Sequence, residues 1–220
     1  MPDLNTTLHV DMLREHHKGN SIYRRLKRAV KALLLSEDLY GLEWGDPEVY
    51  PPLAFIRDRY VLPYVNPSHN ALEIGPGGGR WTRYLLGFGK LYVVDYYPDL
   101  LEELRKNFRK PHMTFVLNHG TDFPGVQEKS IDFVLSFGCF VHLDTDLIDA
   151  YLANIRHILK PGGNAVIHYS DKTKVYAQTH SGFSDNTPER MRRMVLGAGV
   201  RILEEDLTTM PHISIVRFTR

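Results

Sequence analysis

From residue 70 onward, short apolar runs alternate with stretches whose apolar residues recur at helical spacing. The runs predict strands and the stretches predict helices. We expect seven strands, at 70–74, 91–95, 113–118, 131–137, 164–170, 201–207 and 213–219. We expect the intervening helices at 80–87, 98–108, 144–160 and 187–199. This order is typical of an α/β protein with a doubly wound, mostly parallel sheet of seven strands. No helix separates the last two strands, so the last one can run antiparallel.

The first 67 residues do not follow this alternation. Residues 21–35 carry apolar side chains at helical spacing, and five basic residues between 24 and 31 form the other face. A solvated face explains those charges better than a partner or phosphate surface does. A turn-rich aromatic linker at 39–52 and a helix at 53–65 follow. We expect 1–67 to form a helical extension or lid on the core and 68–220 to form the main domain.

Proline and glycine mark the ends of several elements. Pro98 and Pro188 stand where a first helical turn accepts proline, and Thr187 can cap the second of these helices. The tripeptide Pro-Gly-Gly at 161–163 is expected to end the helix at 144–160, because neither residue type continues a helix well.

A glycine-rich turn follows the first strand, in the stretch EIGPGGG. A dinucleotide-binding turn needs G-x-G-x-x-G. The third glycine of this pattern is missing whether it starts at Gly75 or at Gly77. The P-loop pattern of phosphate-binding enzymes is also absent. Such a turn can serve only to join a strand to a helix, but a turn without the pyrophosphate pattern also suits a nucleoside ligand that lacks phosphates.

Two carboxylates flank this turn in the predicted sheet. Glu73 can receive an ammonium group, and Asp95 ends the next strand, where a carboxylate binds ribose hydroxyls. Tyr96 can cover an adenine face. A ligand with an ammonium group, a ribose and an adenine but no phosphate is S-adenosylmethionine.

Four segments extend this interpretation: LEIGPGGGRWT, VVDYYPDLLEEL, SIDFVLSFGCFVHL and IRHILKPGGNAVIH. With them, residues 68–220 resemble the class I S-adenosylmethionine-dependent methyltransferases, which have a Rossmann-like fold. The segments are specific for this family and not for a substrate. The resemblance implies S-adenosylmethionine as cofactor, S-adenosylhomocysteine as product and no metal.

The resemblance also implies which residues hold the cofactor. Those lining its methionine part or turning the chain beside it are Glu73, Gly75, Gly77 and Gly79, and Asp95 with Tyr96 would hold the nucleoside. The contact to the adenine amino group stays open among His119, Gly120 and Asp122. Ser136 and Phe137 should pass beside the sulfonium.

Histidines near the strand ends are the catalytic candidates. His142 follows the fourth strand, where an acceptor should meet the methyl group, and histidine suits proton transfer near neutral pH. An equally supported role is to orient the loop. His168 is the second candidate, although a strand-end residue satisfied by backbone is the favoured role for it and for Tyr169. Trp44, Tyr169 and His180 are the candidate substrate contacts, since the linker and the polar loop at 178–186 should border the pocket.

The composition bears on the cellular compartment of the protein and on the kind of acceptor it uses. The formal net charge is +1, the single cysteine excludes an internal disulfide, and the histidines show no zinc-site spacing. The start is too polar for a signal peptide and no run is long enough for a membrane span, so we expect a cytoplasmic protein with no membrane partner.

These observations favour a methyltransferase with a small-molecule acceptor, with O-methylation slightly ahead of N-methylation, and disfavour a nucleic-acid partner. The alternatives are an RNA or protein methyltransferase and a non-catalytic module that binds the cofactor. The tetrapeptide NPPY or DPPY of many N-methyltransferases is absent after the fourth strand, where SFGC stands. A homodimer is left open.

Overall fold

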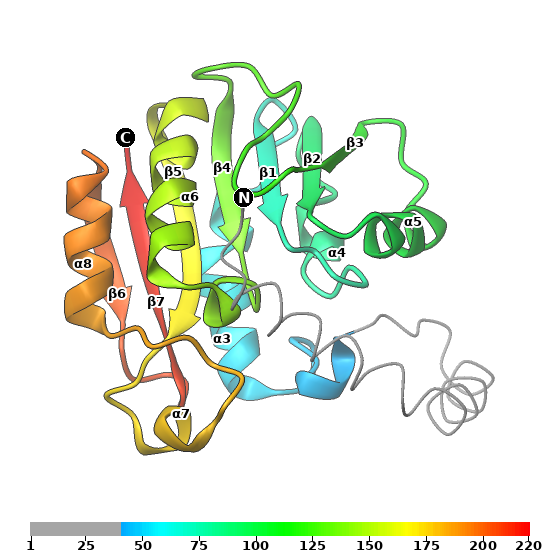
Figure 1. Cartoon of the computed structure of the whole chain (residues 1–220). Coiled ribbons are helices and arrows are strands. Elements are labelled where there is room, and N and C mark those ends of the chain that lie inside the picture. The colour runs from blue at the N-terminus through cyan, green and yellow to red at the C-terminus, as the bar shows by residue number, and fades with distance from the viewer. Residues whose placement is uncertain (1–40) are drawn as a thin grey trace.

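The computed structural model describes residues 41–220 (Figure 1). A sheet with the strand order β3-β2-β1-β4-β5-β7-β6 forms its centre. The strands are β1 (Asn70–Ile74), β2 (Lys90–Asp95), β3 (Met113–Leu117), β4 (Ile131–Ser136), β5 (Leu159–Ser170), β6 (Arg201–Asp206) and β7 (Ile213–Thr219). Strands β1 to β5 pair in parallel, whereas β7 runs antiparallel to both β5 and β6. The predicted fold class, including the reversed last strand, is confirmed.

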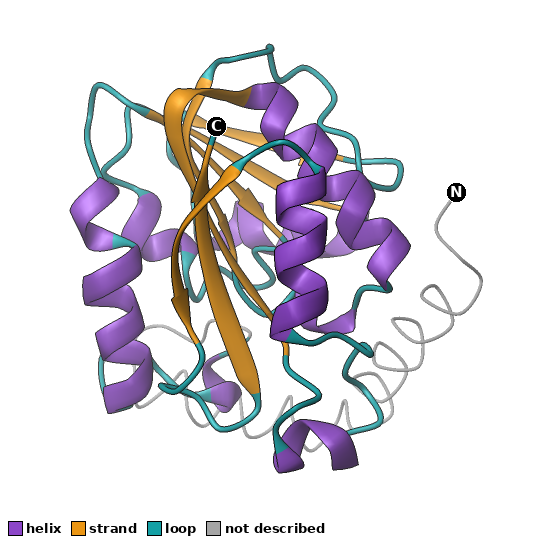
Figure 2. Ribbon diagram, turned by 90° about the vertical axis from the view of Figure 1, so that its left-hand side faces the viewer, coloured by secondary structure: helices purple, strands orange, loops and turns teal. Residues whose placement is uncertain are grey.

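Helices cover both faces of the twisted sheet (Figure 2). The α-helices are α3 (Pro51–Tyr60), α4 (Thr82–Leu85), α5 (Pro98–Asn107), α6 (Thr145–Ile158), α7 (Val175–Thr179) and α8 (Pro188–Gly197). The 3₁₀ turns are η1 (Leu42–Trp44), η2 (Leu62–Tyr64) and η3 (Phe140–His142). Apolar residues of α6 and α8 belong to one core cluster, and those of α3, α4 and α5 belong to the other. Alternate residues of β1 divide between the two clusters, because successive strand side chains point to opposite faces.

The sheet reverses its winding between β1 and β4. The chain passes from β1 outward to β2 and β3, and then returns to place β4 on the other side of β1. All five parallel strands end at the same edge, which is the lower edge in Figure 1. Ligands of such sheets bind outside the carboxyl ends of the strands at this reversal.

The helix predicted at 53–65 is shorter in the structure. Helix α3 ends at Tyr60, and the 3₁₀ turn η2 contains Pro63. Proline has no N–H to donate, and it disfavours the α conformation of the residue before it. The apolar periodicity therefore continues past the point at which the helix has to end.

The turn predicted at 161–163 is also different. Helix α6 already ends at Ile158, and β5 includes the Pro-Gly-Gly tripeptide as an irregular stretch. The pairing with β4 jumps from Leu159 opposite Ile131 to Asn164 opposite Phe133. Glycine suits this stretch because Gly162 has φ +80°. The tripeptide thus makes a bulge inside a strand and does not end the helix.

The described part of the N-terminal extension packs on the sheet. Leu53, Ile56 and Tyr60 of α3 are buried in the second core cluster. Arg59 and Tyr60 also bond to Glu204 of β6, at 2.9 and 3.1 Å. The helix predicted at 21–35 lies outside the described residues, and the division between 1–67 and 68–220 stays a prediction.

Candidate functional site

The glycine-rich turn after β1 is shaped by backbone that only glycine adopts easily. Gly75, Gly77 and Gly79 have φ values of +68°, +54° and +99°. A Cβ atom on Gly75 would lie 2.6 Å from Cβ of Cys139, and one on Gly79 would lie 2.1 Å from the ring of Phe108. Glycine at 75 and 79 therefore lets the turn pack against Cys139 and Phe108, and its approach to a ligand stays a prediction.

Glu73 precedes this turn on β1 and is 2% exposed. Its Oε2 accepts a hydrogen bond of 2.6 Å from the hydroxyl of Thr82, the first residue of α4. The pKa of Glu73 is raised to about 8, mainly by burial. The hydrogen bond from Thr82 lowers this pKa, and the nearby Asp95 contributes to raising it. The side chain is therefore mostly protonated at neutral pH until a cation reaches it.

Asp95 ends β2, beside the turn. Its Oδ1 accepts a hydrogen bond of 3.0 Å from the backbone N–H of Tyr97. Burial raises its pKa to about 6, so the carboxylate is mostly ionised at neutral pH. Tyr96, the residue predicted to cover an adenine, is 40% exposed and packs edge-on against Tyr97.

The end of β3 holds a residue that the sequence analysis missed. Asn118 is 2% exposed, and its Nδ2 donates to the carbonyl of Gly120 and to the hydroxyl of Tyr151. Its Oδ1 is buried without a hydrogen-bond partner. Such an atom is costly unless a donor reaches it. The signal that could have revealed Asn118 is its polar side chain at the end of an apolar strand.

The three residues predicted to contact the adenine amino group lie just beyond. Asp122 accepts a hydrogen bond of 2.7 Å from the backbone N–H of His119, and both residues are exposed. The carbonyl of Gly120 is already bonded to Asn118 and Tyr151. The geometry therefore favours Asn118 over these three for a buried contact.

The loop after β4 is fixed to β1 and β5. Ser136 donates to the carbonyl of Ile74 at 3.0 Å. The backbone N–H of Gly138 donates to Nδ1 of His168 at 3.2 Å, and Phe137 stacks on the His168 ring with centroids 3.9 Å apart. Burial lowers the pKa of His168 well below its usual range. His168 is therefore neutral with its proton on Nε2, which favours a positioning role over the predicted catalytic one.

His142 lies in η3, at the same edge. Its Nδ1 is 2.6 Å from the carbonyl oxygen of Gly182. A carbonyl only accepts, so Nδ1 carries the proton and Nε2 is the accepting nitrogen of the neutral ring. This tautomer is the one that a general base needs.

The site has the features that an adenosylmethionine-like ligand requires. Glu73 and Asp95 are buried carboxylates without a cationic partner in residues 41–220. The ligand's ammonium group and ribose hydroxyls would supply the missing partners. Asn118 Oδ1 lacks the donor that an amino group would bring. The described residues therefore fit this cofactor.

Comparison with known proteins agrees with this geometry. Residues 71–163, which contain the glycine turn and the ends of β1, β2 and β4, match a family described as "Methyltransferase domain". A TehB-like SAM-dependent methyltransferase of Corynebacterium glutamicum has a similar structure, with a TM-score of 0.59 and 18% sequence identity. The similarity covers 90% of this chain and 97% of that one. Residues 71–163 therefore resemble a methyltransferase domain, and the fold of the chain is that of S-adenosylmethionine-dependent methyltransferases of known structure.

Two curated proteins resemble this chain over part of their length. The highly reducing polyketide synthase NEC1 of Pyricularia oryzae is 30% identical over 148 residues, which is 60% of this chain and 5% of that protein. The methyltransferase-like protein C25B8.10 of Schizosaccharomyces pombe is 27% identical over 111 residues, which is 50% of this chain and 40% of that protein. The chain thus spans less than half the length of either relative.

The three residues predicted to contact a substrate have different surroundings. Trp44 in η1 is 52% exposed. Tyr169 is fully buried in a core cluster, which does not favour contact with a substrate. His180 follows α7, and its Nδ1 accepts a hydrogen bond of 3.3 Å from the N–H of Gly182, the residue that also binds His142. The structure therefore brings His142 and His180 together and leaves Tyr169 in the core.

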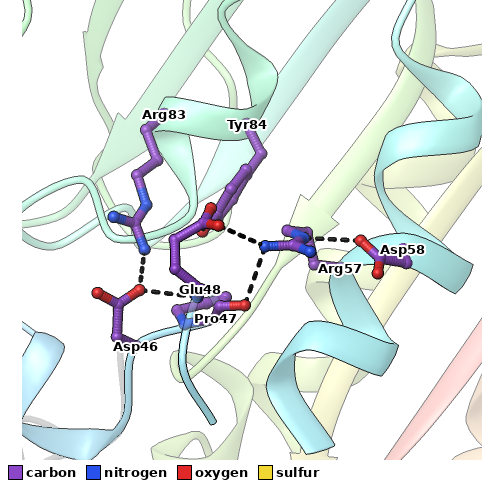
Figure 3. Close-up of polar contacts among 7 residues, drawn as sticks. All are labelled: Asp46, Pro47, Glu48, Arg57, Asp58, Arg83 and Tyr84. Carbon is purple, nitrogen blue, oxygen red and sulfur yellow. Dashed lines mark hydrogen bonds and ion pairs between the residues drawn. The ribbon is translucent and has the colours of Figure 1, made fainter. Parts of the chain in front are cut away.

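A short strap, Asp46–Glu48, fastens the segment before α3 to α4 (Figure 3). Arg83 of α4 pairs with Asp46, and the hydroxyl of Tyr84 donates to Glu48 at 2.7 Å. Arg57 of α3 completes the set by bonding the carbonyl of Pro47 at 3.0 Å and pairing with Glu48 at 2.9 Å. Because α4 follows the glycine turn directly, these contacts hold the strap close to that turn.

Other chemistry has less support among the described residues. No group of three or more His, Cys, Asp or Glu side chains between 41 and 220 could hold a metal ion. Burial raises the pKa of Cys139 to about 12, so it is a thiol at neutral pH. Of the helices in the described part, none is long and apolar enough to cross a membrane.

Proposed function

We propose that this protein transfers the methyl group of S-adenosylmethionine to an oxygen or nitrogen atom of a small-molecule acceptor. One observation carries the proposal: two buried carboxylates, on Glu73 and Asp95, flank a glycine turn at the switch point of the sheet. Neither has a cation beside it in residues 41–220. That pair of acceptors complements a ligand with an ammonium group at one end and ribose hydroxyls nearer the other.

The cofactor residues have distinct roles in this proposal. Glu73 receives the ammonium group, and Asp95 accepts hydrogen bonds from the ribose hydroxyls. Tyr96 covers one face of the adenine, and Asn118 Oδ1 accepts from its amino group. The remaining lining comes from the residues that the resemblance indicated, namely Gly75, Gly77, Gly79, His119, Gly120, Asp122, Ser136 and Phe137.

His142 acts as the general base for a hydroxyl acceptor. The bound cofactor supplies a methyl group on a positively charged sulfur, and its methyl–sulfur bond breaks with the electron pair left on sulfur. Nε2 of His142 takes the hydroxyl proton while the acceptor oxygen forms its bond to the methyl carbon. An amine that arrives deprotonated needs only to be oriented by the site. Most of the remaining rate comes from alignment of the acceptor with the methyl group.

The acceptor is proposed from charge and from the surroundings of the site. A formal net charge of +1 gives no field that would attract nucleic acid. Proteins of similar structure differ in their acceptors: one is a glycopeptide N-methyltransferase, and another is a geranyl diphosphate C-methyltransferase from Streptomyces coelicolor. A third forms a complex with the Trm112 activator of Haloferax volcanii. A small acceptor in the cytoplasm, without a resident metal, is our proposal within this range.

The cofactor assignment is tested by calorimetry on the full chain. We expect S-adenosylmethionine and S-adenosylhomocysteine to bind with one-to-one stoichiometry and NADH not to compete. Transfer from methyl-labelled cofactor to panels of phenols, alcohols and amines then tests the acceptor class. Label that appears only in added RNA or protein would overturn the proposal of a small-molecule acceptor. Absence of cofactor binding would overturn the proposed methyl transfer altogether.

Replacing Asp95 with alanine should weaken S-adenosylhomocysteine binding by about 1 to 3 kcal/mol, since hydrogen bonds to a charged group are lost. Calorimetry measures the change. Glu102→Ala, on the exposed side of α5, is the matched control and should leave affinity unchanged. An unaltered affinity in Asp95→Ala would remove the ribose assignment.

A further inference from the structure

The two edge strands of the sheet differ in how they are protected from pairing with another chain. β6, at one edge, carries Arg201 and three acidic residues, and a register shift interrupts its pairing with β7. Charged side chains and irregular pairing are common means of protecting an edge strand. β3, at the other edge beside α5 (Figure 1), reads Met-Thr-Phe-Val-Leu and pairs with β2 in unbroken register. It has no charge, no proline and no bulge, so β3 lacks these protections.

The outer side of β3 presents the backbone groups of Phe115 and Leu117. The N–H of Asn118 donates to the carbonyl of Asp95 on β2. Successive residues of a strand direct their backbone groups to opposite sides, so those of Leu117 and Phe115 point away from β2. Within residues 41–220 no further strand pairs with β3, and Leu117 is 40% exposed. One more strand can therefore pair with this edge.

A basic cluster flanks the same edge, at the end of α5 and in the turn that leads to β3. Its members are exposed and are Arg105, Lys106, Arg109 and Lys110. Together with Phe115 they line a hollow of about 530 Å³. Arg105 lies over the Phe115 ring at 4.8 Å and pairs with Glu102 at 3.3 Å. The other three cations take part in no ion pair of the described chain.

Charge decides which kind of strand suits this edge. A second copy of this chain would bring a second basic cluster to the edge, and like charges oppose that pairing. An acidic strand would instead place carboxylates near the cluster while its backbone pairs with β3. The formal net charge of the whole chain is only +1, so the attraction is a local property of this edge.

We propose that the edge of β3 is a docking surface for an acidic, extended segment of another protein. The segment adds to β3 as a further strand, and its backbone bonds to the outward N–H and carbonyl groups of Phe115 and Leu117. Backbone pairing supplies affinity, and the basic cluster supplies the preference for acidic side chains. This docking surface does not depend on the proposed methyl transfer.

The probe for this surface is a capped peptide of alternating valine and glutamate, titrated into the full chain and followed by nitrogen-15 NMR of the backbone amides. We expect the amides of Phe115 and Leu117 to shift and to exchange with solvent more slowly. The same peptide with every backbone nitrogen methylated should not bind, because it cannot donate to the strand. A peptide of alternating valine and lysine should bind at least about tenfold more weakly, because the basic cluster repels it.

One pair of variants isolates the backbone contribution. Leu117→Pro removes an outward N–H and leaves the hydrogen bonds to β2 in place, as proline on an edge strand allows. Leu117→Ala removes the same side chain but keeps the N–H, so it is the matched control. The peptide should bind Leu117→Pro about threefold to tenfold more weakly than Leu117→Ala, the cost of one lost hydrogen bond.

A second pair of variants isolates the charge contribution. Arg109→Glu combined with Lys110→Glu should weaken binding of the valine–glutamate peptide by about tenfold, because two attractive contacts become repulsive. Arg201→Glu, on the opposite edge of the sheet, is the matched control and should leave the affinity unchanged. The difference between the first variant and the unaltered protein should shrink as salt is added.

Several results would overturn the proposal. These are no binding of the valine–glutamate peptide, equal affinity in the two Leu117 variants, and an unchanged affinity after the double charge reversal. Oligouridylate that binds more tightly than the peptide, and equally well to Leu117→Pro, would show a surface for polyanions. A dimer in sedimentation that Leu117→Pro abolishes would show that a second copy occupies the edge. If Leu117→Pro does not fold, as judged by thermal unfolding, the methylated peptide makes the same comparison.

Discussion

Replacing His142 with alanine should lower the turnover number by about 10²- to 10⁴-fold, the usual contribution of a positioned general acid or base. The affinity for S-adenosylhomocysteine should change less than about twofold, because the proposed role of His142 is toward the acceptor and not toward the cofactor. Steady-state kinetics with the acceptor found in the label-transfer screen measures the first quantity, and calorimetry measures the second.

His157→Ala is a suitable control for this comparison. His157 also lies at the protein surface, on α6, and pairs with Glu128 outside the site. Its loss should leave turnover unchanged. If His142→Ala also retained full turnover, His142 would only orient the loop, and an acceptor that arrives deprotonated would be the remaining explanation.

The second large effect concerns Glu73 and pH. The pKa of Glu73 is raised from 4.5 to about 8 in the folded, ligand-free protein. For a raised carboxyl pKa, the contribution to stability is fully present below the unfolded pKa and is lost as pH rises through the folded pKa. The free energy of unfolding should therefore fall between about pH 5 and pH 9, by up to about 3 to 5 kcal/mol from this group.

Glu73→Gln should remove most of that decline, because glutamine does not titrate. Urea unfolding at intervals across this range gives the slope for each protein, and the difference between them isolates Glu73 from Asp95, which titrates in both. Equal slopes would contradict the raised pKa. Because a bound ammonium favours the carboxylate, cofactor binding near pH 7 should also release a proton, which calorimetry in two buffers of different ionisation enthalpy detects.

Much of the site follows from local sequence. The period of the apolar residues predicted seven strands and their places along the chain, since the alternation of strands and helices is a local property. Glu73 and Asp95 were found because each stands at the end of an apolar run, and parallel strands end at one edge. The glycine turn was found from the spacing of Gly75, Gly77 and Gly79.

Other features depend on contacts between segments distant in sequence. The Pro-Gly-Gly stretch at 161–163 is a bulge because its strand pairs with Ile131, and no local rule contains that register. Tyr169 is buried because its side of β5 packs on a core cluster. The alternation of residues along a strand does not say what each side packs against. Asn118 is a site candidate because Tyr151 and Gly120 leave only its oxygen unpaired.

The sequence by itself therefore determined the strands of the mostly parallel sheet and the two carboxylates beside the glycine turn, since these depend on periodicity and strand ends. Only the tertiary structure decided the roles of the histidines. A histidine acts according to which nitrogen carries its proton, and the hydrogen bonds of the folded chain decide that. For His142 the deciding partner is the carbonyl of Gly182, which lies forty residues further along the chain.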